Sequence, residues 1–128
     1  MTHEKINDSN KLIAEFMGHT DVVIGTHYNE KRYPSGTAVW SKKDHETYYH
    51  DYNISWDWLM PVVEKILNDN TSCCSYGAPH YFSEQEEWRF TMLDDQLNDQ
   101  QGEGDTMIDS TYKTVVKFIT WYNKNQKL

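Results

Sequence analysis

Apolar residues recur at helical spacing in three stretches of the chain. The first follows Asp8 or Ser9, either of which can cap a helix, and stops at Gly18; its apolar face holds Leu12, Ile13, Phe16 and Met17. The last follows Asp105 or Asp109 and carries the stripe Ile108, Tyr112, Val115, Ile119 and Tyr122. Both patterns predict amphipathic helices, and the polar residues 1–7 are expected to form a frayed, flexible lead-in.

The middle stretch predicts a helix that contains a proline. After Ser55, a suitable N-cap, the residues at helical spacing are Trp56, Leu59, Met60, Val63, Ile66 and Leu67. Pro61 allows two interpretations. Either it kinks the helix after the first turn, or the regular helix begins at this proline.

Strand patterns lie between these helices. Residues 21–28 include the β-rich run Val22, Val23, Ile24 and Thr26, and residues 33–36 have turn chemistry before a short return strand at 37–40. Residues 81–82 and 87–93 are further strand candidates. In the latter, Trp88, Phe90 and Met92 alternate with Arg89, Thr91 and Leu93.

Other stretches have no helix or strand pattern. Residues 69–79 are a loop by composition, residues 94–105 are an acidic loop rich in Gln and Gly, and residues 41–53 allow no assignment. Together the predicted helices and strands indicate an α+β fold: a small antiparallel or mixed sheet packed with about three helices, similar to an α-β-α sandwich. With no repeat and no linker, residues 1–128 are predicted to form a single domain.

The charge narrows the possible partners. Lys and Arg number 12 against 20 Asp and Glu, which gives a net charge of −8. Nucleic-acid affinity comes mainly from cations that neutralise phosphates, so we expect no nucleic-acid partner. The acidity serves solubility, or else mimics a phosphate backbone to block a DNA-binding enzyme.

The remaining bulk features predict a cytoplasmic protein. No apolar run approaches the roughly 20 residues that span a bilayer, and the polar start is unlike a signal peptide. The adjacent cysteines Cys73 and Cys74 rarely bridge each other without strain.

Aromatic side chains are concentrated between residues 40 and 58, where Trp40, Tyr48, Tyr49, Tyr52, Trp56 and Trp58 are interleaved with His45 and His50. Such a surface suits stacking on a nucleobase or gripping a protein, although some of these rings can simply fill the core. As ligand-binding residues we predict Trp40, His45, Tyr48, Tyr49 and His50. Arg32 and Arg89, the two arginines, are predicted to meet a phosphate.

The sequence gives weaker support for a catalytic site or a metal site. His45, His50 and Asp51, with the distant His80, do not have the spacing of a zinc site, and Cys73–Cys74 would need His80 as a base to act as a nucleophile. The carboxylates of residues 94–105 miss the calcium-loop consensus. We therefore predict no catalytic residues, no metal and no cofactor.

Three segments resemble a known group of proteins: residues 10–18, ending in Met-Gly, residues 55–66 and residues 118–123. They are similar to the opening, the second helix and the last helix of the phage α-β-α sandwich family of phages, prophages and Bacteroidetes elements. The matching residues are largely of core type. The resemblance implies a fold and a phage setting. It implies no activity and no catalytic residues, because the family has no agreed activity.

Together these observations predict a non-catalytic phage protein in the cytoplasm of an infected bacterial host. It would antagonise host defence by sequestering a nucleotide-derived immune signal, and would self-associate as a homodimer or higher homo-oligomer. One alternative is a protein-binding inhibitor or adaptor of a host enzyme, acidic and possibly a DNA mimic. Another is a small hydrolase.

Overall fold

The computed structural model describes residues 1–69, 74–75, 79–93 and 99–126. The chain divides into two compact units, residues 1–52 and residues 53–128. Over the described residues the architecture is α+β, with helices and two small antiparallel sheets, as predicted. The single domain stays a prediction.

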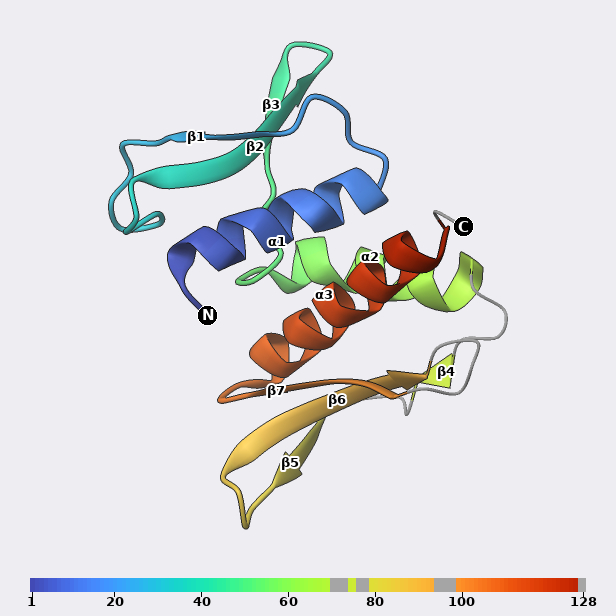
Figure 1. Cartoon of the computed structure of the whole chain (residues 1–128). Coiled ribbons are helices and arrows are strands. Elements are labelled where there is room, and N and C mark those ends of the chain that lie inside the picture. The colour runs from blue at the N-terminus through green and yellow to red at the C-terminus, as the bar shows by residue number, and fades with distance from the viewer. Residues whose placement is uncertain (70–73, 76–78, 94–98, 127–128) are drawn as a thin grey trace. The chain divides into compact units, whose positions relative to one another are not determined.

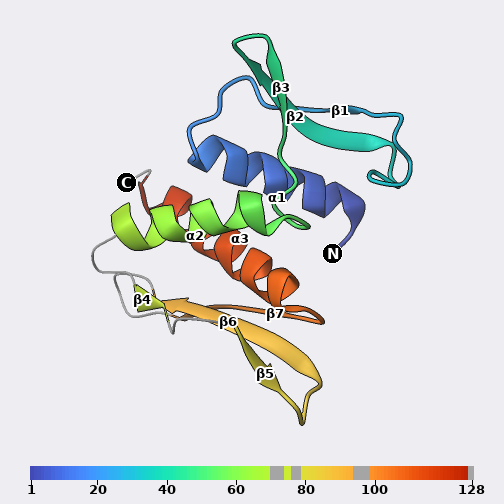
Figure 2. The same ribbon diagram turned by 180° about the vertical axis from the view of Figure 1, so that it is seen from behind.

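The first unit consists of one helix and a three-stranded sheet. Helix α1 (His3–Phe16) precedes strands β1 (Val23–Thr26), β2 (Thr37–Lys43) and β3 (Glu46–Tyr49). The strands are antiparallel in the order β1-β2-β3. In both views α1 runs along one side of this sheet (Figures 1 and 2), where Asn7 donates a hydrogen bond to Thr37.

Helix α1 begins earlier than the sequence predicted. Thr2 is its N-cap: its hydroxyl accepts a hydrogen bond from the backbone N–H of Lys5, at 3.2 Å. Such a cap satisfies one of the free N–H groups of the first turn, so the helix extends through residues that we expected to be flexible. The helix ends near Gly18, as predicted, and this glycine has a φ of 92°.

A tight hairpin accounts for residues 41–49 of the stretch that had no assignment. Strands β2 and β3 are joined at Asp44 and His45, whose φ angles are 53° and 68°. Two consecutive positive φ angles are characteristic of the type I′ turn of two-residue hairpins. These positions usually hold Asn or Gly, so Asp-His gave no turn signal.

The second unit is built around strand β6. It comprises α2 (Trp56–Asp69), β4 (Cys74–Ser75), β5 (His80–Phe82), β6 (Glu87–Leu93), β7 (Asp99–Gly104) and α3 (Met107–Gln126). Strand β6 pairs with β7 along one edge and with β5 and then β4 along the other. Helix α2 begins at Trp56, so Pro61 lies inside it and is not its first residue.

Strand β7 corrects the prediction of an acidic loop. Residues 99–104 form a strand that pairs along β6, and α3 lies over this pair in both views (Figures 1 and 2). Gly102 and Gly104 are buried where they face α3. A Cβ on Gly102 would lie 2.5 Å from the backbone nitrogen of Thr114. The buried face of β7 is therefore made of glycine, which leaves no apolar alternation to read.

Helix α3 carries the stripe that the sequence predicted. Tyr112, Val115 and Ile119 are buried, and Ile108 and Tyr122 are half-buried. Its first turn is capped by Thr106, whose hydroxyl accepts from the N–H of Asp109 at 3.1 Å, rather than by either aspartate. Beside the stripe lie the buried polar residues Ser110, Thr111 and Thr114.

Thr114 joins this helix to the sheet. Its hydroxyl accepts from the N–H of Gly102 at 2.7 Å and lies 2.6 Å from the carbonyl oxygen of Phe90 and 2.8 Å from that of Ser110. One buried hydroxyl thus bridges β6, β7 and the preceding turn of α3. Glycine at position 102 is what allows the helix to approach this closely.

Candidate functional site

The first sheet has two chemically different faces. Cross-strand partners share a face, so Trp40 lies beside Tyr49 of β3 and Val23 of β1. The next residues along β2, Val39 and Ser41, belong to the opposite face, which α1 covers. We call the face that bears Trp40 the aromatic face; its rings are His27, Tyr33, Trp40 and Tyr49.

The indole of Trp40 lies across strand β1. A Cβ on Gly25 would be 2.9 Å from the indole nitrogen and 3.5 Å from the neighbouring ring carbon. The absence of a side chain at Gly25 therefore lets the ring lie close to the backbone. Trp40 is half-buried, so part of the indole is open to solvent.

The other three rings form a compact cluster on the aromatic face. The centroid of His27 is 5.1 Å from that of Tyr49, with the rings nearly perpendicular, and 4.8 Å from that of Tyr33. Tyr33 and Tyr49 are 6.1 Å apart. These distances are typical of favourable edge-on and offset ring contacts. His27 and Tyr49 are half-buried, whereas Tyr33 is buried.

A buried carboxylate anchors one side of the aromatic face. Asp51 is buried and accepts hydrogen bonds from the Arg32 guanidinium, through Nε at 3.0 Å and through Nη2, and from the Tyr33 hydroxyl at 3.0 Å. The hydrogen bond to Asp51 raises the pKa of Arg32, and burial with the nearby carboxylate raises that of Tyr33. The site therefore holds a cation in place beside the neutral Tyr33 ring.

Two cations border the rings. The Arg32 side chain is 47% exposed, and its guanidinium carbon is 5.6 Å from the centroid of Tyr33. The ammonium of the exposed Lys42 is 5.7 Å from the centroid of Trp40. Both distances suit cation–π contacts. Arg32 thus lies against the buried Tyr33 ring and Lys42 against the half-buried Trp40 ring, and Asp51 offsets the charge of Arg32.

The opposite face of the sheet holds His50. This side chain is fully buried, with Nε2 2.8 Å from the Ser41 hydroxyl and Nδ1 3.4 Å from that of Tyr52. His19 packs against it, with ring centroids 4.5 Å apart. Burial, with a smaller contribution from His19, lowers the pKa of His50 to about 4. His50 is thus a neutral core residue that has no surface to offer a ligand.

The Ser41–His50 contact is not suited to nucleophilic catalysis. Both side chains are buried, so a substrate would have no route to the serine hydroxyl. A catalytic nucleophile must instead reach the substrate. The groups satisfy each other's hydrogen bonds, as buried polar groups generally do.

The other predicted residues of this unit lie away from the aromatic face. His45 is exposed at the tip of the β2–β3 hairpin. Tyr48 is the cross-strand partner of Ser41, so it belongs to the face opposite Tyr49, and its hydroxyl donates to Glu46 at 2.9 Å. Of the predicted ligand-binding residues, the structure brings Trp40, Tyr49 and Arg32 to one surface.

Arg89 belongs to a cluster on the second unit. Its guanidinium lies 4.3 Å from the centroid of Phe82 and donates to Glu87, at 3.0 Å from Nε and 2.6 Å from Nη2. Glu103 is its cross-strand partner. With carboxylates on its own strand and the next, Arg89 is poorly placed to attract a phosphate.

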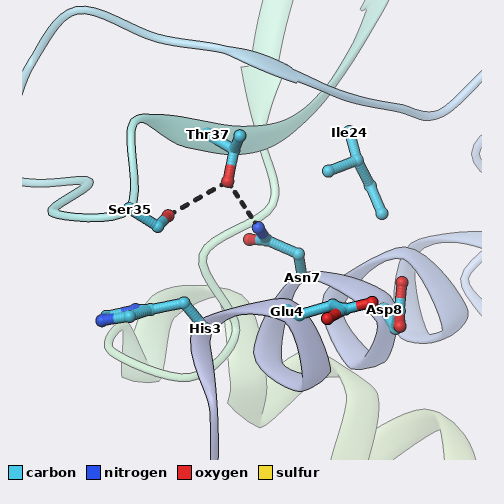
Figure 3. A pocket seen from close by; sticks show the side chains of 7 residues that line it. All are labelled: His3, Glu4, Asn7, Asp8, Ile24, Ser35 and Thr37. Carbon is cyan, nitrogen blue, oxygen red and sulfur yellow. Dashed lines mark hydrogen bonds between the residues drawn. The ribbon is translucent and has the colours of Figure 1, made fainter.

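A groove opens on the α1 side of the first sheet (Figure 3). It has a volume of about 290 Å³ and is lined by His3, Glu4, Asn7, Asp8, Ile24, Ser35 and Thr37. Asn7 donates to the Thr37 hydroxyl at 2.7 Å, and that hydroxyl is 3.0 Å from the Ser35 hydroxyl. These polar groups satisfy one another, and the carboxylates Glu4 and Asp8 disfavour an anion.

Several predictions concern residues that the structure does not describe. Residue 73, the cysteine side chain at 74 and residues 94–98 lie outside the described part of the chain. Within the described residues, no group of three His, Cys, Asp or Glu side chains could hold a metal ion. No described helix is long and apolar enough to cross a membrane.

Sequence reasoning missed His27, Tyr33 and Gly25. Tyr33 and His27 lie in and beside the β1–β2 connection, where no periodicity indicates a facing direction. Gly25 has no side chain to read, although a glycine inside a strand can mark close approach of another group.

Comparison with known proteins adds no relative. No protein-family model, no curated protein and no solved structure matches the chain. The phage-family resemblance therefore stays a prediction.

Proposed function

We propose that the first unit is a non-catalytic receptor for a planar, anionic ligand of the nucleotide class. The observation that supports this most is the aromatic face, where Trp40 and Tyr49 are adjacent cross-strand partners with open ring surface and Arg32 and Lys42 stand beside them. A base can stack on such rings while its phosphates meet the cations.

The charge distribution supports the choice of this unit. Residues 1–52 contain 6 Lys and Arg against 8 Asp and Glu, whereas residues 53–128 contain 6 against 12. The acidity is thus concentrated in the second unit. The first unit carries only a small net charge, which repels an anionic ligand far less.

In the setting that the phage resemblance implies, such a receptor would remove a nucleotide-derived immune signal from an infected host. Stoichiometric binding is sufficient for this role, and no group on the aromatic face needs to perform chemistry. The host target and the phage origin are proposals that rest on that resemblance.

The first test is thermal unfolding against a panel of mono-, di- and cyclic dinucleotides. A ligand at 100 times its Kd adds about 2.7 kcal/mol of stability, enough to raise the melting temperature measurably. We expect at least one member of the panel to stabilise the parent. A panel that leaves the melting curve unchanged at millimolar concentration contradicts the proposal.

A second candidate function is an inhibitor that covers a basic host protein. The excess of Asp and Glu in the second unit favours it, together with the exposed apolar side chains Trp56 and Met60 of α2. Capture of one basic host protein, at an affinity that falls steeply with salt, would favour this candidate over the first.

A further inference from the structure

Strand β1 lies at one edge of the first sheet. It pairs with β2 on one side, and among the described residues no strand pairs with its other side. Its four residues, Val23–Thr26, carry no charge, and the side chains of Val23 and Ile24 are 41% and 37% exposed. Natural proteins protect such an edge by keeping the strand short or with charge, proline or a covering segment. Over the described residues, β1 shows only the short length.

Two other described edges are protected, whereas the outer edge of the three-residue strand β5 is also uncharged. The outer edge of β7 is covered at Gln101, whose carbonyl oxygen accepts a hydrogen bond from Lys117 of α3. Strand β3 carries Glu46 at its start. An uncharged, exposed edge such as that of β1 can accept another strand.

The hydrogen-bond pattern shows which groups point outward from β1. The N–H of His27 donates to the carbonyl of Gly36 at 2.9 Å, which continues the β1–β2 register by one pair. Bonded and non-bonded pairs alternate in an antiparallel ladder. Gly25 and Val23 therefore bond to β2, whereas Ile24 and Thr26 direct their N–H and C=O groups to the open edge.

We propose that this edge pairs with β1 of a second copy of the chain, antiparallel, about a twofold axis at Gly25. In this register Ile24 of each copy bonds to Thr26 of the other, and both are residues whose backbone groups point outward. Val23 would lie opposite His27, and Asp21 opposite Asn29, so no like charges meet. The result is one continuous six-stranded sheet.

The pairing would join the aromatic faces of the copies. Directly opposed residues of a non-bonded antiparallel pair have Cα atoms about 4.5 Å apart, so the Gly25 residues meet at the axis. Because each Trp40 lies over its own Gly25, the indoles of the copies become neighbours. This part rests on the proposed function: each ligand site would then include a ring from the other copy.

The test uses a matched pair of proline variants of the full chain. Thr26→Pro removes an outward N–H from β1. Thr47→Pro does the same on the outer edge of β3, because His50 donates to Val39 and the alternation places the Thr47 N–H outward. Both threonines are exposed, and proline is tolerated on edge strands where the N–H faces solvent. Circular dichroism verifies folding.

Sedimentation velocity without ligand reads out the association. We expect the parent and Thr47→Pro to reach twice the chain mass of 15.2 kDa. Thr26→Pro should raise the dimer Kd at least about tenfold, because the symmetry removes its hydrogen bond twice. A parent that stays monomeric, or equal weakening by both prolines, overturns the proposal.

Hydrogen exchange on the parent tests the same edge without a substitution. The Thr26 amide should become more protected as protein concentration rises, whereas the Thr47 amide should not. Protection of Thr26 that is independent of concentration overturns the pairing even if a variant fails to fold. Failure of nucleotide binding in a normal dimer would refute the proposed function and leave the pairing standing.

Discussion

Replacing Thr114 by Val tests whether its hydroxyl holds α3 to the second sheet. Valine has nearly the same shape, but it removes the acceptor of the Gly102 N–H and the group that lies 2.6 Å from the Phe90 carbonyl. Thr114 is fully buried, so water cannot replace these contacts without a rearrangement.

The expected loss of stability follows from the buried groups that would no longer have the Thr114 hydroxyl as a hydrogen-bond partner. A buried donor or acceptor that loses its hydrogen bond costs about 1–3 kcal/mol. With one N–H certain to lose its acceptor and one carbonyl affected, we expect Thr114→Val to lower the free energy of unfolding by about 2–4 kcal/mol. Thr114→Ser keeps the hydroxyl and loses one methyl group, which should cost only about 1 kcal/mol.

Equilibrium unfolding in urea provides the measurement, with both variants compared at one pH and salt concentration. The expected order is parent, then Ser, then Val, although valine is the more apolar residue. A Val variant as stable as the Ser variant would show that the hydroxyl bridge does not stabilise the packing of α3 on β7.

Three further results are expected. Gly102→Ala should destabilise the protein strongly, since its Cβ would meet backbone atoms of α3 at 2.5 and 2.6 Å; an unchanged melting temperature would contradict this. Val115→Asp should lower the free energy of unfolding in urea by several kcal/mol, because it buries an unpaired charge. Burial lowers the pKa of His50 to about 4, from 6.5. Between pH 6.5 and about 4, His50 is protonated only in the unfolded chain. Lowering the pH through this range should therefore decrease the free energy of unfolding by about 3 kcal/mol. A folded His50→Gln variant should show a correspondingly weaker pH dependence of unfolding, whereas the exposed His45→Gln should not; equal curves for all three proteins would refute the assignment.

The sequence predicted the helices and strands whose side chains alternate between core and solvent. Strand β6 and helix α3 are of this kind, with apolar residues at regular spacing. Strand β1 was predicted instead from its run of β-rich residues, although Val23 and Ile24 are exposed. Strand β7 could not be found in this way, because its buried face is formed by Gly102 and Gly104 and its other residues are polar.

The candidate site was predicted only in part because its geometry depends on strand register. Tyr48 and Tyr49 are adjacent residues of the same type, yet the alternation of side chains along a strand places them on opposite faces of the first sheet. That assignment required the hairpin turn at Asp44 and His45, which lacks the usual Asn or Gly. The burial of His50 follows from the same register, so it could not be predicted from the sequence either.

The adjacent tyrosines provide the most direct test of the aromatic face. Calorimetry with the nucleotide that most stabilises the parent should show that folded Tyr49→Ala binds about 5- to 150-fold more weakly, the equivalent of the 1–3 kcal/mol that stacking contributes per base. Tyr48→Ala, a change to the neighbouring residue on the opposite face, should bind like the parent. Equal affinities for the parent and both variants, or a loss confined to Tyr48→Ala, would contradict the claim that the aromatic face is the binding site.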